Sequence, residues 1–381
     1  MFYFVIKIEK QLEVYYHKKH KMNLLVITQK YDGNDSNLGA FNIWWDKIAQ
    51  KTDKIYILAL EKHSEAYAPN MTILSMGKEK GLRKIGRLFN FYKNLFKILS
   101  ETDIVFVHMI PLYLILAWLP AKIFGNKIIM WYAGVTMNNW VRLAVWLSDK
   151  SLTSQEGALR TKSRKRLVIG HGIDTDKFQI SGDKLKADNQ IIILSVGRIT
   201  PSKGHDLIIK SVADLIGKGY ELKLNIIGGV IQEYHREYFE YLKKLATDLN
   251  ISKKVEFTGD VNYNQMPGYY DNAEILIDAV PAGGFDKVIL EAMASGVVPL
   301  TSNEYLKPVF PENLREKLFF KQGDLKDLLE KLKAILDKKF WEDGETVIKL
   351  RNIVVEKYSL GAFIDKLFHI FNELVFNELA K

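Results

Sequence analysis

A buried strand passes into a helix through the stretch Val196-Gly197-Arg198-Ile199-Thr200-Pro201-Ser202-Lys203-Gly204-His205-Asp206. The apolar run that ends at Val196 predicts the strand, and the amphipathic pattern after Gly204 predicts the helix. In open α/β sheets, ligands bind at the carboxyl ends of the parallel strands. Arg198 and Lys203 would place two permanent cations at that edge, where they suit a diphosphate that is held and then leaves. The alternative interpretation is a capped helix that carries two surface charges.

Short strand patterns alternate with helical patterns along the whole chain, at the positions 24–28, 55–58, 104–107, 127–131, 191–196, 222–227, 255–257 and 275–279. Such alternation predicts parallel sheets with helices on both faces. The 381 residues suffice for two such domains. We place the joint in the polar stretch 179–189, so that the N-terminal domain covers 1–185 and the second covers 186–358. The last segment, 359–381, should form a helix that returns to the N-terminal domain, and residues 1–21 precede the first convincing strand as an extension.

The net charge of +9 is confined to the N-terminal half of the chain. Up to and including Asp188 there are 29 Lys and Arg against 17 Asp and Glu, and the remainder carries 25 against 28. This half should therefore face an anionic partner such as the phosphates of a membrane. Nucleic acid is disfavoured because the chain has no basic tail, zinc finger or aromatic–basic RNA motif. With Cys 0, disulfides, thiolate nucleophiles and iron–sulfur clusters are excluded, and a cytoplasmic setting is expected.

Two segments bear on contact with a membrane. Residues 78–99 combine many Lys and Arg with an apolar stripe of Leu82, Ile85, Phe89, Tyr92, Phe96 and Leu99. This pattern predicts either a basic amphipathic helix on an anionic membrane, at its inner face, or a core-facing stripe with a solvated basic back. Residues 104–121 contain no charged residue, but His108, Pro111 and Pro120 interrupt them. That interruption favours a buried strand followed by an apolar helix over a membrane span.

A second ligand motif reads Pro281-Ala282-Gly283-Gly284-Phe285-Asp286-Lys287-Val288-Ile289-Leu290-Glu291-Ala292-Met293-Ala294-Ser295-Gly296. Its Gly-rich turn leads into a short helix, whose first backbone N–H groups can meet phosphate or sugar oxygens. Glu291, on the first two turns of that helix, can accept hydrogen bonds from a ribose diol. The alternative for Glu291 is a solvated carboxylate on a helix surface.

In their order and spacing, these motifs resemble the nucleotide-sugar half of family-4 retaining glycosyltransferases with the GT-B fold. The resemblance implies two Rossmann-like domains whose parallel sheets face each other across a cleft. The segments that carry it are Val196–Asp206, Phe257-Thr258-Gly259 and Gly283–Gly296, then the interdomain phrase Leu152-Thr153-Ser154 with Val168–Asp174 and Phe178, and more weakly Asn37-Leu38-Gly39 and Asp103–His108.

The resemblance also implies individual roles. Arg198 and Lys203 would grip the donor diphosphate, Glu291 the donor ribose, and His108 would lie at the reaction centre. Gly39 would let its loop approach the diphosphate, Gly228 would lie near the nucleobase, and the turn of Gly284, Phe285 and Asp286 would reach sugar and phosphate by its backbone. One departure matters, because Gly283 stands where the family has the first of two glutamates, which contacts the transferred sugar.

We therefore expect a retaining hexosyltransferase that moves a sugar from a UDP- or GDP-sugar to a membrane-associated glycan or lipid-linked acceptor. We expect no cofactor and no metal, since the sequence Asp174-Thr175-Asp176 has the DxD form but falls in the interdomain phrase. Because of Gly283, a weakly active or inactive sugar-nucleotide-binding scaffold in glycan assembly is the alternative, and a sugar-nucleotide epimerase on the same fold is a third hypothesis.

Overall fold

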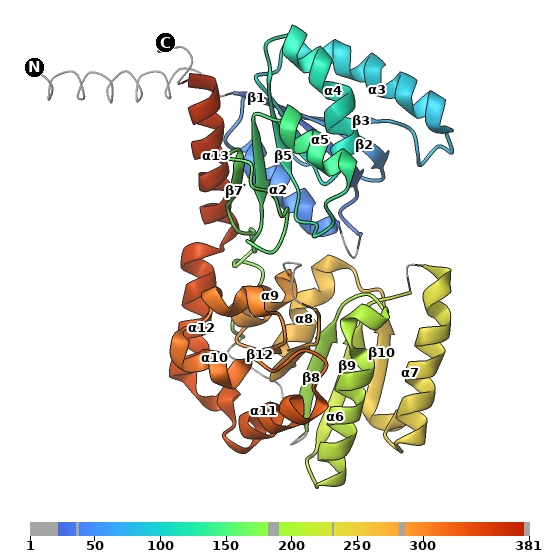
Figure 1. Ribbon diagram of the computed structural model, residues 1–381, viewed down its shortest axis with the longest axis vertical. Helices are drawn as coiled ribbons and strands as arrows, with labels where there is room; N and C mark the ends of the chain where they lie inside the picture. The colour runs from blue at the N-terminus through green and yellow to red at the C-terminus, as the bar shows by residue number, and fades with distance from the viewer. Residues whose placement is uncertain (1–21, 36–37, 182–189, 231, 282–285, 377–381) are drawn as a thin grey trace, which may run out of the picture.

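Every strand pairing within the two sheets of this protein is parallel. The computed structural model describes residues 22–35, 38–181, 190–230, 232–281 and 286–376. They form a 7-stranded and a 5-stranded sheet, which lie in the upper, blue-to-green lobe and in the lower lobe of Figure 1. The two parallel sheets predicted from the alternating pattern are confirmed.

The larger sheet has the strand order β3-β2-β1-β4-β5-β6-β7. Its inner strands are apolar on both faces, and all five residues of β4 are buried, because helices cover both sides of the sheet. The strands are β1 Asn23–Tyr31, β2 Lys54–Lys62, β3 Met71–Ser75, β4 Ile104–His108, β5 Lys127–Trp131, β6 Lys150–Thr153 and β7 Arg166–Val168.

Two helix layers enclose the larger sheet, each with its own apolar cluster. Helices α2 and α13 pack on one face, and α3, α4 and α5 pack on the other. The bounds of these helices are α2 Gly39–Ala49, α3 Lys84–Leu99, α4 Pro111–Ile123, α5 Asn139–Leu147 and α13 Leu360–Phe376.

The smaller sheet has the strand order β10-β9-β8-β11-β12 and holds one continuous apolar core with its helices. Its strands are β8 Ile191–Val196, β9 Leu222–Ile227, β10 Val255–Gly259, β11 Ile275–Asp278 and β12 Val298–Thr301. Its helices are α6 His205–Gly217, α7 Arg236–Asp248, α8 Met266–Asp271, α9 Lys287–Ala294, α10 Glu312–Leu318, α11 Leu325–Asp337 and α12 Gly344–Lys357.

The last helix of the described chain, α13, leaves the lower lobe and packs on the larger sheet (Figure 1). The Leu360 N–H donates to the carbonyl of Ile173, so the start of α13 is bonded to the segment where the chain first crosses between the lobes. Phe363 and Phe371 are fully enclosed in the cluster beneath the sheet. Residues 1–21, 377–381 and most of the joint at 179–189 lie outside the described residues.

Two membrane-related segments have defined structures. None of the helices among the described residues is long and apolar enough to cross a membrane. Residues 104–121 form β4 and most of α4, as the sequence predicted. The helix predicted over 78–99 begins only at Lys84, because Gly77 and Gly81 turn the chain before it with φ of 92° and 72°.

Candidate functional site

The two lobes meet at the carboxyl ends of their strands, where most of the singled-out residues lie. Asn262 of the lower lobe donates a hydrogen bond of 2.9 Å to the Asn34 side chain of the β1–α2 loop. The Trp44 indole of α2 donates to the carbonyl of Gly172, 3.2 Å away. Ala40, at the start of α2, packs into the core cluster of the lower lobe. The start of α2 and the loop before it therefore form one wall of the site.

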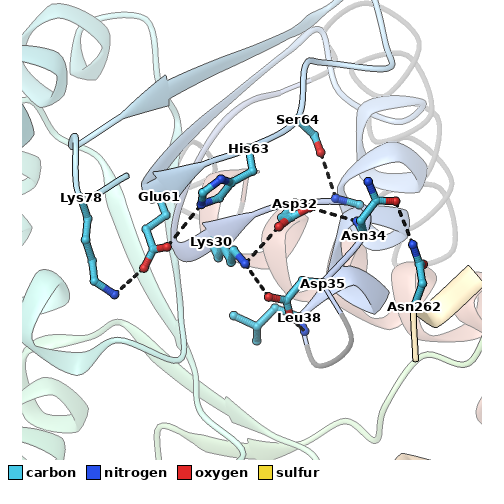
Figure 2. A network of polar contacts seen from close by, with 11 residues as sticks. Lys30, Asp32, Asn34, Asp35, Leu38, Glu61, His63, Ser64, Lys78 and Asn262 are labelled. Carbon is cyan, nitrogen blue, oxygen red and sulfur yellow. Dashed lines mark hydrogen bonds and ion pairs between the residues drawn. The ribbon is translucent and has the colours of Figure 1, made fainter. Parts of the chain in front are cut away.

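Figure 2 shows how the β1–α2 loop is held. Lys30 lies at the centre and contacts Asp32 at 3.0 Å and Asp35 at 2.6 Å. Burial alone would lower the pKa of Lys30, but its bonds to these two carboxylates raise it above the usual value. Asp35 also accepts from the Leu38 N–H, at 2.7 Å. This network ties the end of β1 to Asp32, Asp35 and the start of α2.

Gly39 begins α2 and packs tightly against its own loop. A Cβ at this position would lie 3.2 Å from the Gly33 carbonyl oxygen, which is closer than most side chains tolerate. The absence of a side chain therefore lets the helix start lie on the loop backbone. Its expected approach to a diphosphate stays a prediction.

His108 ends β4 and is enclosed, with 1% of its surface exposed. Its Nδ1 is hydrogen bonded to Thr28 Oγ1 at 3.1 Å, and its Nε2 has no partner among the described residues. The Phe41 ring covers it, with centroids 4.3 Å apart. Burial, with a smaller contribution from His171, lowers the pKa of His108 to about 3, so the imidazole is neutral at physiological pH.

Sequence reasoning missed an aromatic cluster around this histidine. Phe41 and Trp44 of α2 lie between His108 and His171, with Trp44 4.9 Å from the His171 ring. Burial, with Lys287 as the next cause, lowers the pKa of His171 to about 3 as well. The only sequence signal was the dense run of aromatic residues after Gly39.

Lys203 is partly buried at the β8–α6 junction and is already bound to a carboxylate. Its Nζ lies 2.7 Å from Asp286 Oδ1, at the start of α9. Burial alone would lower the pKa of Lys203, but Asp286 and Asp278 raise it above its usual value. The two motifs singled out from the sequence thus meet through this ion pair.

Gly204 and His205 set the shape of that junction. Gly204 has φ of 62°, and a Cβ there would lie 2.8 Å from the Ala279 carbonyl oxygen. His205 is buried, is bonded to Ser195 Oγ through Nδ1 at 3.0 Å and donates from Nε2 to the Arg198 carbonyl at 3.3 Å. Burial lowers its pKa to about 4. The bond from His205 anchors the Arg198 backbone, whereas the Arg198 side chain is exposed at the carboxyl edge of the smaller sheet.

Asp278, at the end of β11, is a buried carboxyl that sequence reasoning missed. Its Oδ2 accepts from Thr301 Oγ1 at 3.1 Å. Burial and the neighbouring Asp286 raise its pKa to about 7, although Lys203 opposes the shift. The positive charge of Lys203 therefore offsets negative charge on the carboxyl groups of both Asp278 and Asp286.

Glu291 lies on α9 with 1% of its surface exposed. Its two oxygens accept hydrogen bonds from the hydroxyl groups of Tyr263 at 3.2 Å and Tyr270 at 3.0 Å. Lys287 lies 3.9 Å from Glu291 Oε1 and 4.4 Å from the centroid of the Tyr263 ring. A carboxylate has about four acceptor positions, so these bonds leave room for a further donor.

Gly228 directly follows β9 with φ of 136°, and its backbone lies against the β8–α6 junction. A Cβ there would lie only 2.1 Å from the Gly197 carbonyl oxygen. Gly284 and Phe285, together with Gly283, lie outside the described residues. Gly228, Arg198, Lys203 and α9 are thus brought together, whereas His108 and Gly39 lie on the upper wall.

The Asp174-Thr175-Asp176 sequence forms a turn in which Asp174 accepts from the Lys177 and Phe178 N–H groups. No group of three or more His, Asp or Glu in the described ranges could hold a metal ion.

Comparisons with known proteins find a family model over part of the chain and a likeness in fold over most of it. Residues 176–353 match the family model described as glycosyl transferases group 1. A GDP-Man:Man(3)GlcNAc(2)-PP-Dol alpha-1,2-mannosyltransferase of Dictyostelium discoideum is 30% identical over 149 residues, 37% of this chain and 27% of that protein. The capsular polysaccharide biosynthesis glycosyltransferase CapM of Staphylococcus aureus is 26% identical over 201 residues, 50% of each chain. This chain thus spans half or less of these relatives.

Among solved structures, HepE of Anabaena in complex with UDP and glucose superposes with a TM-score of 0.75 at 13% identity. The likeness covers 92% of this chain and 100% of that one. At this level of identity it shows the fold, which is GT-B.

Proposed function

We propose that this protein is a retaining glycosyltransferase that uses a nucleotide diphosphate sugar, because residues 176–353 match the family model of the glycosyl transferases group 1 and the chain has the GT-B fold. The observation that carries the proposal is the pair of cations at the β8–α6 junction. Lys203 already holds a carboxylate oxygen of Asp286 at 2.7 Å, which is the geometry needed for a phosphate oxygen. Arg198 lies exposed in the same loop.

In the proposed reaction, the bond between the anomeric carbon and the donor diphosphate breaks, and a bond to the acceptor hydroxyl oxygen forms on the same face. The proton of that hydroxyl passes to an oxygen of the leaving diphosphate. Negative charge builds up on the leaving diphosphate, and Arg198 and Lys203 stabilise it. Two permanent positive charges can carry out this neutralisation, so the proposal includes no metal. Glu291 would accept from the ribose hydroxyls, in addition to its tyrosine donors.

His108 takes a positioning role in this proposal. Its Nε2 is buried, so the neutral ring can offer this atom to the transferred sugar only if the packing around it opens. The burial of the site supports hydrogen bonding rather than proton transfer, because an imidazole with a pKa of about 3 is a weak base at neutral pH.

We infer that the acceptor is a membrane-associated glycan or a lipid-linked saccharide. The basic excess lies on the N-terminal half, and one relative is named for a dolichol-linked glycan and another for capsular polysaccharide.

A binding-only scaffold remains the second candidate because Gly283 replaces the first family glutamate. Calorimetry with UDP and GDP, followed by turnover assays with UDP- and GDP-sugars, separates the two candidates. Nucleotide release that depends on Arg198 and Lys203 supports the enzyme, and binding without release supports the scaffold.

A further inference from the structure

The outer side of the α3–α5 layer is apolar where a helix layer in water would be polar. Ile85 is 84% exposed, Phe89 68%, Ile123 72% and Trp146 69%. We define the apolar face as the exposed residues Leu82, Ile85, Leu88, Phe89, Phe96, Leu112, Leu119, Ile123, Phe124, Trp140, Leu143 and Trp146. Exposed apolar side chains grouped on one side of a domain mark an interaction surface.

The apolar face is separate from the side of these helices that packs into the domain core. On α3, Phe91 and Leu95 are fully buried against the sheet, whereas Phe89 and Phe96 point away from that core. Helices α4 and α5 repeat the arrangement, each with a buried side in the same cluster and an exposed apolar side. Packing of this lobe therefore does not account for the apolar face.

The helices join their exposed sides into one surface. The ring of Phe96 on α3 lies 6.4 Å from the ring of Phe124, which ends α4. Tyr92 stacks on Phe96 and donates its hydroxyl to the Leu116 carbonyl of α4. Helices α4 and α5 pack against each other, and all three lie on the same side of the upper lobe in Figure 1.

The charged residues of these three helices indicate what kind of partner the apolar face would bind. Helices α3, α4 and α5 contain no Asp or Glu, and their charged residues are Lys84, Arg87, Lys93, Lys97, Lys122 and Arg142. A second copy of this chain would bring like charges together, and a nucleic acid would leave the apolar side chains in water. An anionic bilayer satisfies both components, since phosphates meet the cations while apolar side chains enter the acyl boundary.

We propose that the apolar face is a docking surface for an anionic lipid bilayer. This inference deepens the proposed membrane acceptor of the same enzyme, and it extends the contact from the predicted 78–99 segment to three helices. These helices follow β3, β4 and β5, so they begin near the carboxyl edge of the sheet, where the site lies. A lipid-linked acceptor in the docked bilayer would then lie beside the opening of the site.

Flotation of the full-length protein with phosphatidylcholine vesicles, with and without phosphatidylglycerol, tests the docking. We expect binding to the vesicles with phosphatidylglycerol and weaker binding at high salt. The variant F89S/W146S should weaken partitioning by at least about ten-fold, because two large apolar side chains no longer enter the bilayer. The matched control Y234S/I348S removes side chains that are 71% and 54% exposed on the lower lobe, and it should bind like wild type.

A second variant tests the charge separately. K93E/K97E should lose binding to anionic vesicles with its thermal unfolding midpoint unchanged, since both side chains are exposed. Binding of wild type to neither vesicle, or full binding of F89S/W146S, would overturn the proposal. It is also overturned if wild type is a dimer that F89S/W146S converts to a monomer without any vesicle binding. Binding of UDP or GDP should be unaffected in F89S/W146S, so a failure of docking is distinguishable from a failure of the proposed transferase.

Discussion

Substitution of Lys203 by Met tests the proposed diphosphate site while keeping the length of the side chain. The wild-type Nζ lies 2.7 Å from Asp286 Oδ1, with both side chains less than 20% exposed. A charge-assisted hydrogen bond in such a setting contributes about 1.5–3 kcal/mol. If Lys203 makes the same bond to a donor phosphate, K203M should weaken UDP or GDP binding by about 10- to 150-fold.

The effect on turnover should exceed the effect on binding, because charge on the diphosphate grows as it leaves. Loss of one such stabilising donor lowers kcat by about 10²–10³ in other enzymes. Calorimetry measures the dissociation constant, and a nucleotide-release assay with UDP- and GDP-sugars measures kcat/KM. The matched control is K210M, seven residues further along the chain in α6, where the lysine is partly exposed and 3.4 Å from Asp206.

Substitution of Asp286 should change nucleotide affinity in the opposite direction to substitution of Lys203. Asp286 accepts a hydrogen bond from the Lys203 ammonium, so its carboxylate competes with a donor phosphate for that group. D286N keeps the start of α9 but removes the competing charge, and it should bind UDP or GDP more tightly while K203M binds them more weakly. Unchanged binding in K203M, or weaker binding in both variants with intact thermal unfolding midpoints, would refute the assignment.

Three further outcomes follow from the same contacts. G228A should lower the free energy of unfolding by more than about 3 kcal/mol in urea titrations, because its Cβ would meet the Gly197 carbonyl oxygen at 2.1 Å. The control G217A, in open space on α6, should leave the free energy of unfolding unchanged or raise it. Equal effects of the two substitutions would contradict the described packing of Gly228. Asp278 has a folded-state pKa of about 7 against 3.8, so its contribution to stability is present below about pH 4 and is lost as the pH rises through 7. D278N should therefore be more stable relative to wild type at about pH 8 than at about pH 5, by about 2–3 kcal/mol, and a difference of the opposite sign would reject the buried neutral carboxyl. His108 should stay neutral between about pH 5 and pH 8 in nitrogen NMR spectra, and a titration midpoint near its usual value would show that the ring is not enclosed as described.

The central strands were predictable from sequence because burial on both faces makes them continuous apolar runs. Eight of the strands confirm predicted segments, and the four that the sequence did not reveal are β3, β6, β7 and β12. These are short, and β3, β7 and β12 are edge strands. β12 contains Pro299, which argues against a strand in general but is tolerated at an edge.

The site was predictable only where one loop carries the chemistry. Arg198 and Lys203 follow a strand and precede a helix, so their position at the ligand edge could be inferred from local pattern. The partners of these residues come from far along the chain, since Asp286 is 83 positions from Lys203. The tyrosine donors to Glu291 and the enclosure of His108 by Phe41 likewise depend on tertiary packing, which periodicity does not encode.

The most direct test is the release of nucleotide diphosphate from a panel of UDP-, GDP- and ADP-sugars incubated with a membrane lipid extract. We predict release with at least one donor by the wild-type protein and its loss in R198A/K203A. The control K210A/K218A removes two lysines that are ion-paired on α6, and it should release nucleotide at the wild-type rate. Release by R198A/K203A at the wild-type rate would contradict the claim that these two cations hold and stabilise the leaving diphosphate.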